Sequence, residues 1–240
     1  MFHFLSVFYS TVIYQPILNA LIFLYQTVAF RDLGLAIILL TILIRLLLYP
    51  LFHKGARYQM VMQHLQPKIK KIQDEHKGNY EKQTQALMAL YKEHEVNPWS
   101  GFLLLLVQLP VLIALYHVFL STGKPEILTN LYHWLPAPGA LNSTLFGLIN
   151  LQQKNIVMVG LAAVAQYFQG RLTLPPVAPG QELSPAEKTT RRMIYFTPVI
   201  TLVIFLNLPA AISLYWLVTT LFSIGQQIII NRQLGLNSKV

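Results

Sequence analysis

Arg45 is the side chain in this sequence best suited to polar chemistry in an apolar setting, because it lies inside the hydrophobic segment 33–52. If that segment crosses a membrane, the arginine costs about 2.5–3.5 kcal/mol near the bilayer centre, and it stays protonated. Every acidic residue falls outside the long apolar segments, so none can pair with it there. We therefore expect Arg45 to face a water-filled cavity. Alternatively, its long side chain reaches the headgroups at the end of the segment.

Other polar side chains recur inside the apolar segments at helical spacings. Those in 208–230 fall three or four residues apart along one helix face, and the two glutamines in 155–172 share a face. The predicted groove residues are Thr41, Arg45, Gln108, Gln166, Gln169, Ser213, Trp216, Thr220 and Ser223. Hydrogen bonding between packed helices is the alternative explanation for the serines and threonines. It explains an arginine accompanied by several glutamines less well.

Several kinds of chemistry have no support in the sequence. There is no glycine-rich phosphate loop, no HExxH and no GxSxG motif. The seven histidines are scattered without metal-ligand spacing, and the chain has no cysteine. Proton- or cation-coupled pumping lacks the usual intramembrane carboxylates. The sequence therefore predicts a protein that is not an enzyme and that needs no metal or cofactor.

The composition shows which elements must carry these residues. Hydrophobic types make up 54% of the 240 residues and charged types only 11%, whereas soluble domains have about 25% charged residues. This excludes a soluble domain and predicts an all-α polytopic membrane protein. We expect five transmembrane helices, at 33–52, 100–121, 155–172, 192–207 and 208–230. The apolar N-terminal part, 1–32, is expected to be a helix lying in the outer membrane interface, with a sixth span as the alternative.

The distribution of basic residues predicts the orientation. Of 18 lysines and arginines, 14 lie in the loops 53–98 and 171–192 and in the tail 231–240. Cytoplasmic loops are enriched in such residues. We therefore expect the N-terminus outside and the C-terminus in the cytoplasm. Segment 122–154 becomes an outer loop and 173–191 a cytoplasmic connection.

The long polar loop 53–98 is predicted to form a helical hairpin around a turn at Lys77-Gly78-Asn79. Methionines on such a hairpin suit adaptable contact with varied apolar partners. The residues proposed for this contact are Met60, Met62, Leu65, Lys70, Lys71 and Met88. The alternative is a solvated connector that packs only on itself.

Four segments together form a specific pattern: GLAIILLTILIRLLLYPL (34–51), LQPKIKKIQ (65–73) with ALYKEHEVNP (89–98), GFLLLLVQLPVLIALY (101–116) and LPAAISLYWLVTTLFSIGQQIIINR (208–232). In this order they resemble the YidC membrane protein insertases, a family related to the insertases of mitochondrial and chloroplast inner membranes. The resemblance implies a five-helix core around a hydrophilic groove that is closed on the outside. It also implies a bacterial inner-membrane location and a cytoplasmic helical hairpin.

The resemblance also suggests roles for particular residues. The groove arginine of the family corresponds to Arg45, its groove threonine to Thr41, and the aromatic residue of its last span to Trp216. The implied partners are nascent membrane proteins and the lipid bilayer, with the ribosome, the signal recognition particle receptor and the Sec translocon as further candidates, and no specific nucleic acid. Compared with the family, the 240 residues contain no cysteine for lipid attachment, and we expect the protein to lack the large outer domain and to have a short C-terminal tail.

The function expected from all this is insertion and assisted folding of nascent inner-membrane proteins, without nucleotide hydrolysis. A structural subunit that clamps partner helices through its polar stripes is the main alternative. A small-solute transporter is a third possibility, but it predicts inverted repeats and intramembrane ion ligands, which the sequence lacks.

Overall fold

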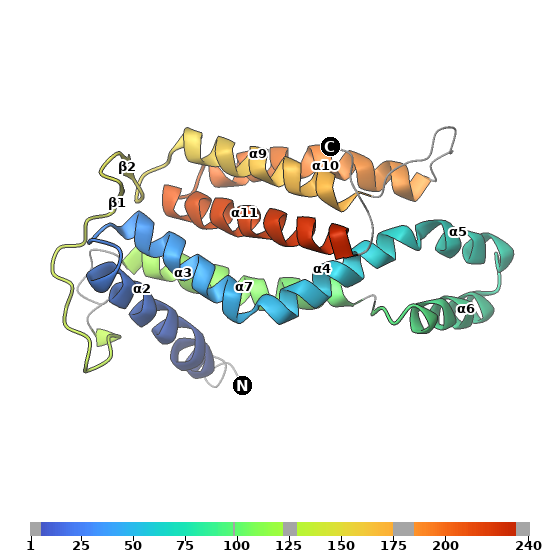
Figure 1. The fold of residues 1–240 in the computed structure, drawn as a ribbon, viewed down its shortest axis with the longest axis horizontal. Helices are drawn as coiled ribbons and strands as arrows, with labels where there is room; N and C mark the ends of the chain where they lie inside the picture. Colours follow the sequence, from blue (N-terminus) through green and yellow to red (C-terminus); the bar gives the residue numbers. More distant parts are fainter. Residues whose placement is uncertain (1–5, 98, 122–128, 175–184, 234–240) are drawn as a thin grey trace.

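The computed structural model describes residues 6–97, 99–121, 129–174 and 185–233. Within them the fold is helical apart from one small β-hairpin, which confirms the expected all-α class (Figure 1). The elements are η1 (Tyr9–Tyr14), α2 (Gln15–Thr27), α3 (Leu33–Leu47), α4 (Tyr49–His64), α5 (Gln66–Glu75), α6 (Tyr80–Glu93), α7 (Ser100–Ser121), β1 (Thr144–Leu145), β2 (Ile149–Asn150), α9 (Ile156–Thr173), α10 (Pro185–Phe205) and α11 (Ala210–Gln233).

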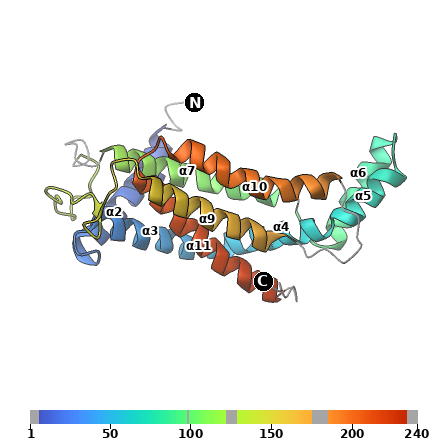
Figure 2. The ribbon, with the colours of Figure 1, turned by 90° about the horizontal axis from the view of Figure 1, so that it is seen from above.

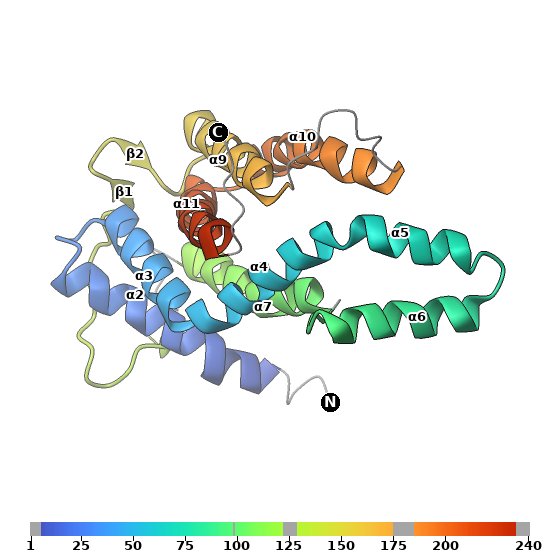
Figure 3. The same cartoon turned by 45° about the vertical axis from the view of Figure 1, so that its right-hand side comes forward.

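The bundle has a long axis along which α7, α9, α10 and α11 run (Figures 1 and 2). At one end, here called the hairpin end, α5 and α6 project away from the bundle. At the other end, the loop end, lie residues 129–155 with the β-hairpin. Helix α11 occupies the centre and packs against both α9 and α3, while α10 packs against α9 (Figure 3).

The first expected span, 33–52, is not one straight helix. Helix α3 ends at Leu47 and α4 begins at Tyr49, and the two axes differ by 71°. Pro50 in the first turn of α4 explains the break, because proline lacks a backbone N–H and its ring clashes with the preceding helical turn. The bend lays α4 against α7, where a Cβ on Gly55 would lie only 2.5 Å from the Leu104 side chain.

The remaining helices lie close to their predicted positions, with one exception. Helix α10 begins at Pro185 rather than at 192, because the polar stretch before the apolar part continues the same helix from a proline in its first turn. Among the described residues, segment 6–27 and α11 are long and apolar enough to cross a membrane, and the bent pair α3–α4 would be a third such span.

The described N-terminal segment, Ser6–Thr27, is a continuous helix that contains a six-residue π-helix, η1. Its α-helical part, α2, packs against α3 and α7 and contributes Leu18, Leu21 and Ile22 to the main core. Its length and composition suit a membrane span, and its axis is inclined to the bundle (Figures 1 and 2). Both the interfacial and the spanning placement remain predictions.

Polar side chains of the N-terminal part hold the connection 129–155 over the loop end. Asp32 caps α3 by accepting from the Leu35 N–H at 2.8 Å, and its second oxygen accepts from the Phe146 N–H at 2.6 Å. The Tyr25 hydroxyl accepts from the Asn142 N–H at 2.8 Å. These bonds give partners to backbone N–H groups at the start of α3 and in the connection. The loop end is therefore a packed, hydrogen-bonded cap.

The hairpin at the other end has its own small core, formed by Leu65, Ile69, Leu90 and Val96. The predicted turn is present, with Gly78 at a φ of +89°, a conformation in which glycine is favoured. Asn79 then caps α6 by accepting from the Lys82 N–H at 3.1 Å. The predicted first arm is divided between α4 and α5, which meet at Leu65 next to Pro67.

Candidate functional site

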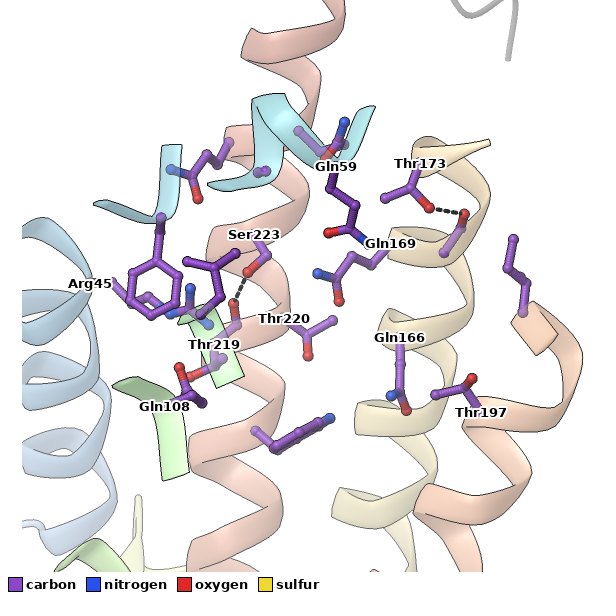
Figure 4. Close-up of a pocket in the computed structure, with 18 residues that line it drawn as sticks. Arg45, Gln59, Gln108, Gln166, Gln169, Thr173, Thr197, Thr219, Thr220 and Ser223 are labelled. Atoms are coloured by element: carbon purple, nitrogen blue, oxygen red, sulfur yellow. Dashed lines mark hydrogen bonds between the residues drawn. The ribbon is translucent and has the colours of Figure 1, made fainter. Parts of the chain in front are cut away.

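A cavity of about 450 Å³ opens within the hairpin-end half of the bundle (Figure 4). Side chains from α3, α4, α7, α9, α10 and α11 line it, and most of them are polar. The polar lining residues are Arg45, Gln59, Gln108, Gln166, Gln169, Thr173, Thr197, Thr219, Thr220, Ser223, Gln226 and Gln227. A cavity of this size and polarity has room and partners for many water molecules.

Arg45 lies at the α3 side of this cavity and is only 7% exposed. Its guanidinium carbon sits 4.3 Å above the centroid of the Phe52 ring. Because Phe52 belongs to α4, the bend after Leu47 is what brings this ring under the arginine. A cation over an aromatic face is favourable, but the ring accepts none of the five guanidinium hydrogen bonds. No acidic side chain is among the described residues that line the cavity. The positive charge of Arg45 can therefore attract a negative group that enters the cavity.

Two contacts between helices lie on the loop-end side of the cavity. The Gln108 side-chain amide of α7 donates to the Tyr215 hydroxyl of α11, and Tyr215 is almost completely buried. The Trp216 ring of α11 also packs edge-on against the Phe205 ring of α10, with 5.3 Å between the ring centroids. We call the Gln108–Tyr215 pair the floor of the cavity.

The α9–α10 wall is joined by a hydrogen bond from the Thr201 hydroxyl to the Gln166 side-chain oxygen, 2.5 Å long. A second connection fixes α11 to the end of α9. There, Gln227 donates to the Asn231 oxygen at 2.9 Å, and the Asn231 amide donates to the Leu172 carbonyl at 3.1 Å. The walls are therefore held together by polar contacts between helices.

Some polar atoms around the cavity have no partner among the described residues. The Trp216 indole N–H and the Gln226 amide nitrogen are buried and make no hydrogen bond there. Buried donors are normally satisfied by protein or by ordered water. These two donors therefore favour a hydrated cavity.

Seven of the nine predicted groove residues line the cavity, and two do not. Thr41 is buried, and its hydroxyl donates to the Ile37 carbonyl of its own helix at 2.6 Å. Ser213 is fully buried on α11 and also lies outside the cavity lining. Each precedes its cavity neighbour, Arg45 or Trp216, on the side toward the loop end. The predicted set of groove residues therefore extends beyond the cavity toward the loop end.

The structure adds lining residues that the sequence reading missed. Gln59 and Phe52 come from α4, and Thr197 comes from α10. The first two reach the cavity only because α4 turns at Leu48, and Pro50 was the available signal for that turn. Thr197 lies one residue before Pro198, inside a segment that the sequence predicts to be a mainly apolar span.

The predicted hairpin contacts are divided between the hairpin's interior and its surface. Met60 and Leu65 are buried, and Met62 packs against the hairpin core. Met88 is 59% exposed, and Lys70 and Lys71 point outward, with Lys71 3.7 Å from Glu75. The exposed members are the ones available to a partner.

Long apolar helices around a polar, arginine-bearing cavity define a helical membrane protein. A family model described as 60Kd inner membrane protein matches residues 23–237. The chain belongs to this family. Its relatives include proteins named membrane protein insertase YidC from Magnetococcus marinus, at 35% identity over 97% of this chain and 36% of the relative, and from Rickettsia bellii, at 31% over 92% and 39%.

A crystal structure described as an active YidC insertase with the first transmembrane domain resolved is also similar. It aligns with a TM-score of 0.58 and 26% identity, covering 88% of this chain and 45% of the other. The chain thus spans little more than a third of the curated relatives and less than half of the solved structure. The shared part contains the helices that build the cavity.

Proposed function

We propose that this protein is a membrane protein insertase and chaperone, which inserts and helps fold nascent inner-membrane proteins. Family membership and the names of the relatives support this function. The observation that carries it is the polar cavity that holds Arg45, in which none of the described lining residues is acidic. Insertion by this route uses no nucleotide.

In this proposal five helices form the membrane core. They are α3 with the start of α4, α7, α9, the apolar part of α10, and α11. The hairpin end lies in the cytoplasm with the C-terminus, and the loop end lies outside. The excess of basic residues in the hairpin and in the loop after α9 supports this orientation.

The cavity shortens the path over which a client's polar segment lacks water. Burying polar groups without hydrogen bonds costs several kcal/mol in an apolar medium, and a hydrated cavity removes that cost for half of the crossing. Arg45 attracts acidic residues of the entering segment. The client's apolar helix then leaves into lipid, drawn by hydrophobic transfer and assisted by the membrane potential.

The floor formed by Gln108 and Tyr215 limits how far water and the polar segment advance. Its support is positional, because Thr41 and Ser213 beyond it are buried and do not line the cavity. The exposed Met88 and Lys70 of the hairpin are proposed to meet clients or the ribosome, the signal recognition particle receptor and the Sec translocon.

Replacing Arg45 with alanine tests the proposal in cells depleted of their own insertase. We expect Arg45→Ala to lower insertion of a client with an acidic outer segment by at least tenfold, because the cavity loses its charge. Arg31→Ala removes the same charge from an exposed position outside the cavity and should insert normally. Equal insertion by all three proteins would refute the role of Arg45.

A photoreactive residue at position 216 separates an insertase from a structural subunit. In an insertase it should crosslink to nascent chains of several different clients, with the crosslink lost when the chain is released. Capture of one fixed partner, independent of translation, would instead indicate a subunit that clamps a partner helix.

A further inference from the structure

A second polar cavity, of about 360 Å³, lies between the N-terminal helix and α7 toward the loop end. It is separate from the cavity that holds Arg45 and shares no lining residue with it. The lining residues are Ser6, Tyr9, Ser10, Tyr14, His117, Ser121 and Asn130. Every one of these side chains can donate a hydrogen bond, and none of them is acidic.

The imidazole of His117 is the central group of this second cavity. Its Nδ1 lies 3.1 Å from the Tyr9 hydroxyl, and both Tyr9 and Tyr14 meet its ring edge-on. An Nδ1 that accepts the Tyr9 hydroxyl leaves the Nε2–H as a donor. The Tyr14 hydroxyl reaches Ser121 at only 3.5 Å, a weak bond that a stronger acceptor could replace.

The surroundings of this polar cavity are apolar and exposed. On α7, His117 is exposed between Ile113 and Leu120, which are exposed one turn away on either side. On the N-terminal helix, Phe8 and Val12 are exposed one turn apart. Exposed apolar side chains of a membrane protein face acyl chains. A cluster of donors at the edge of such a surface lies where lipid headgroups begin.

The backbone around this cavity is itself unusual. Tyr9–Tyr14 form a π-helix, with the Gln15 N–H bonded to the Ser10 carbonyl. π-Helices are rare and are found frequently at functional sites. The wider turn brings Tyr9, Ser10 and Tyr14 to the same cavity.

We propose that this second cavity binds the phosphate group of a lipid headgroup in the leaflet at the loop end. Phosphate oxygens accept strong hydrogen bonds from hydroxyl, amide and imidazole donors, and none of the described residues that line this cavity is acidic, so none of them repels the phosphate. The acyl chains lie along the exposed apolar residues of α7 and the N-terminal helix. The lipid links these two elements beside the bundle. The proposal requires only that the protein is embedded in a membrane, so it stands apart from the insertase function.

Thermal unfolding of the purified full chain in detergent tests this site. Dioctanoyl phosphatidylglycerol at about a hundred times its Kd should raise the Tm by about 5 °C, whereas dioctanoylglycerol, which lacks the phosphate, should not. The shift should disappear in His117→Leu and in Tyr9→Phe, which keeps its ring. His76→Leu, a histidine of the hairpin, is the matched control and should keep the shift.

The proposal would be overturned by an equal shift with dioctanoylglycerol, by an equal shift in both cavity variants, or by the absence of any shift in the unaltered protein. An equal shift with inorganic phosphate alone would assign the site to a free anion and overturn the lipid assignment. If His117→Leu does not fold, Tyr9→Phe still decides the outcome. Insertion assays on the same variants show separately whether the proposed insertase function holds.

Discussion

The two ends of the bundle use polar side chains in opposite ways. At the loop end, Asn19, Tyr25 and Asp32 all bond to the backbone of the connection that covers them. In the hairpin-end half, Arg45 has no carboxylate partner and the Trp216 and Gln226 donors have no partner among the described residues. Polar groups that satisfy one another close a structure, and polar groups left unsatisfied keep a place for water. Polar side chains therefore hold a closed cap at the loop end and line a cavity in the hairpin-end half.

Removing the Asp32 carboxylate from the loop-end cap should cause the largest loss of stability. Asp32→Ala deletes the α3 cap and the bond to the Phe146 N–H together, so we expect the free energy of unfolding to fall by about 2–3 kcal/mol. Chemical unfolding in detergent measures this loss. Asp74→Ala removes the same charge from an exposed hairpin position and should change stability by about 0.5 kcal/mol or less. Equal losses in the two variants would mean that the Asp32 bonds do not hold the cap.

Breaking the Gln108–Tyr215 floor should cost less stability than losing Asp32, but it should let water reach buried positions on its loop-end side. Tyr215→Phe keeps the ring and removes the acceptor for Gln108, so we expect a loss of about 1 kcal/mol in the free energy of unfolding. A cysteine at position 213 should then become reactive to a water-soluble maleimide. Tyr195→Phe, on an exposed ring of α10, should leave that cysteine protected. Continued protection in Tyr215→Phe would show that packing alone forms the floor.

The smallest expected effect concerns the hairpin and pH. Burial lowers the pKa of His64 below its usual value near 6.5, and its Nε2 is buried without a partner among the described residues. The folded hairpin then binds a proton less readily than the unfolded chain. Its stability is fully present above about pH 6.5 and falls as the pH drops from there toward the lowered folded-state pKa. Hydrogen exchange in α5 and α6, corrected for intrinsic rates, should therefore increase at pH 5.5, and His64→Leu should abolish the change.

Much of this contrast is readable in the sequence, because hydrophobic segments and basic loops report directly on membrane helices. The polar spacing also predicted seven residues that line the cavity. Thr41 and Ser213 show the limit of that reasoning. Helical periodicity identifies a face but cannot say where along the face a neighbouring helix closes the space. The Gln108–Tyr215 contact, which we propose closes it here, joins residues 107 positions apart and leaves no local pattern in the sequence.

The bend after Leu47 shows a different limit. Hydropathy over 33–52 is continuous, so the sequence predicts one span although Pro50 lies within it. The direction of a proline break depends on what the next helix packs against, here α7 through the close approach at Gly55. The helical spacing of polar residues in the sequence therefore does not predict that Phe52 and Gln59 line the cavity.

Measuring the water accessibility of the predicted groove residues tests the central claim most directly. The sequence has no cysteine, so single cysteines can be introduced without background labelling. Positions 166, 169, 220 and 223 line the cavity, whereas 41 and 213 are buried and do not. In inside-out vesicles, a membrane-impermeant maleimide should label the first four and leave the last two at least tenfold slower. Protection of all six positions, or equal labelling of all six, would contradict a hydrated cavity closed by Gln108 and Tyr215.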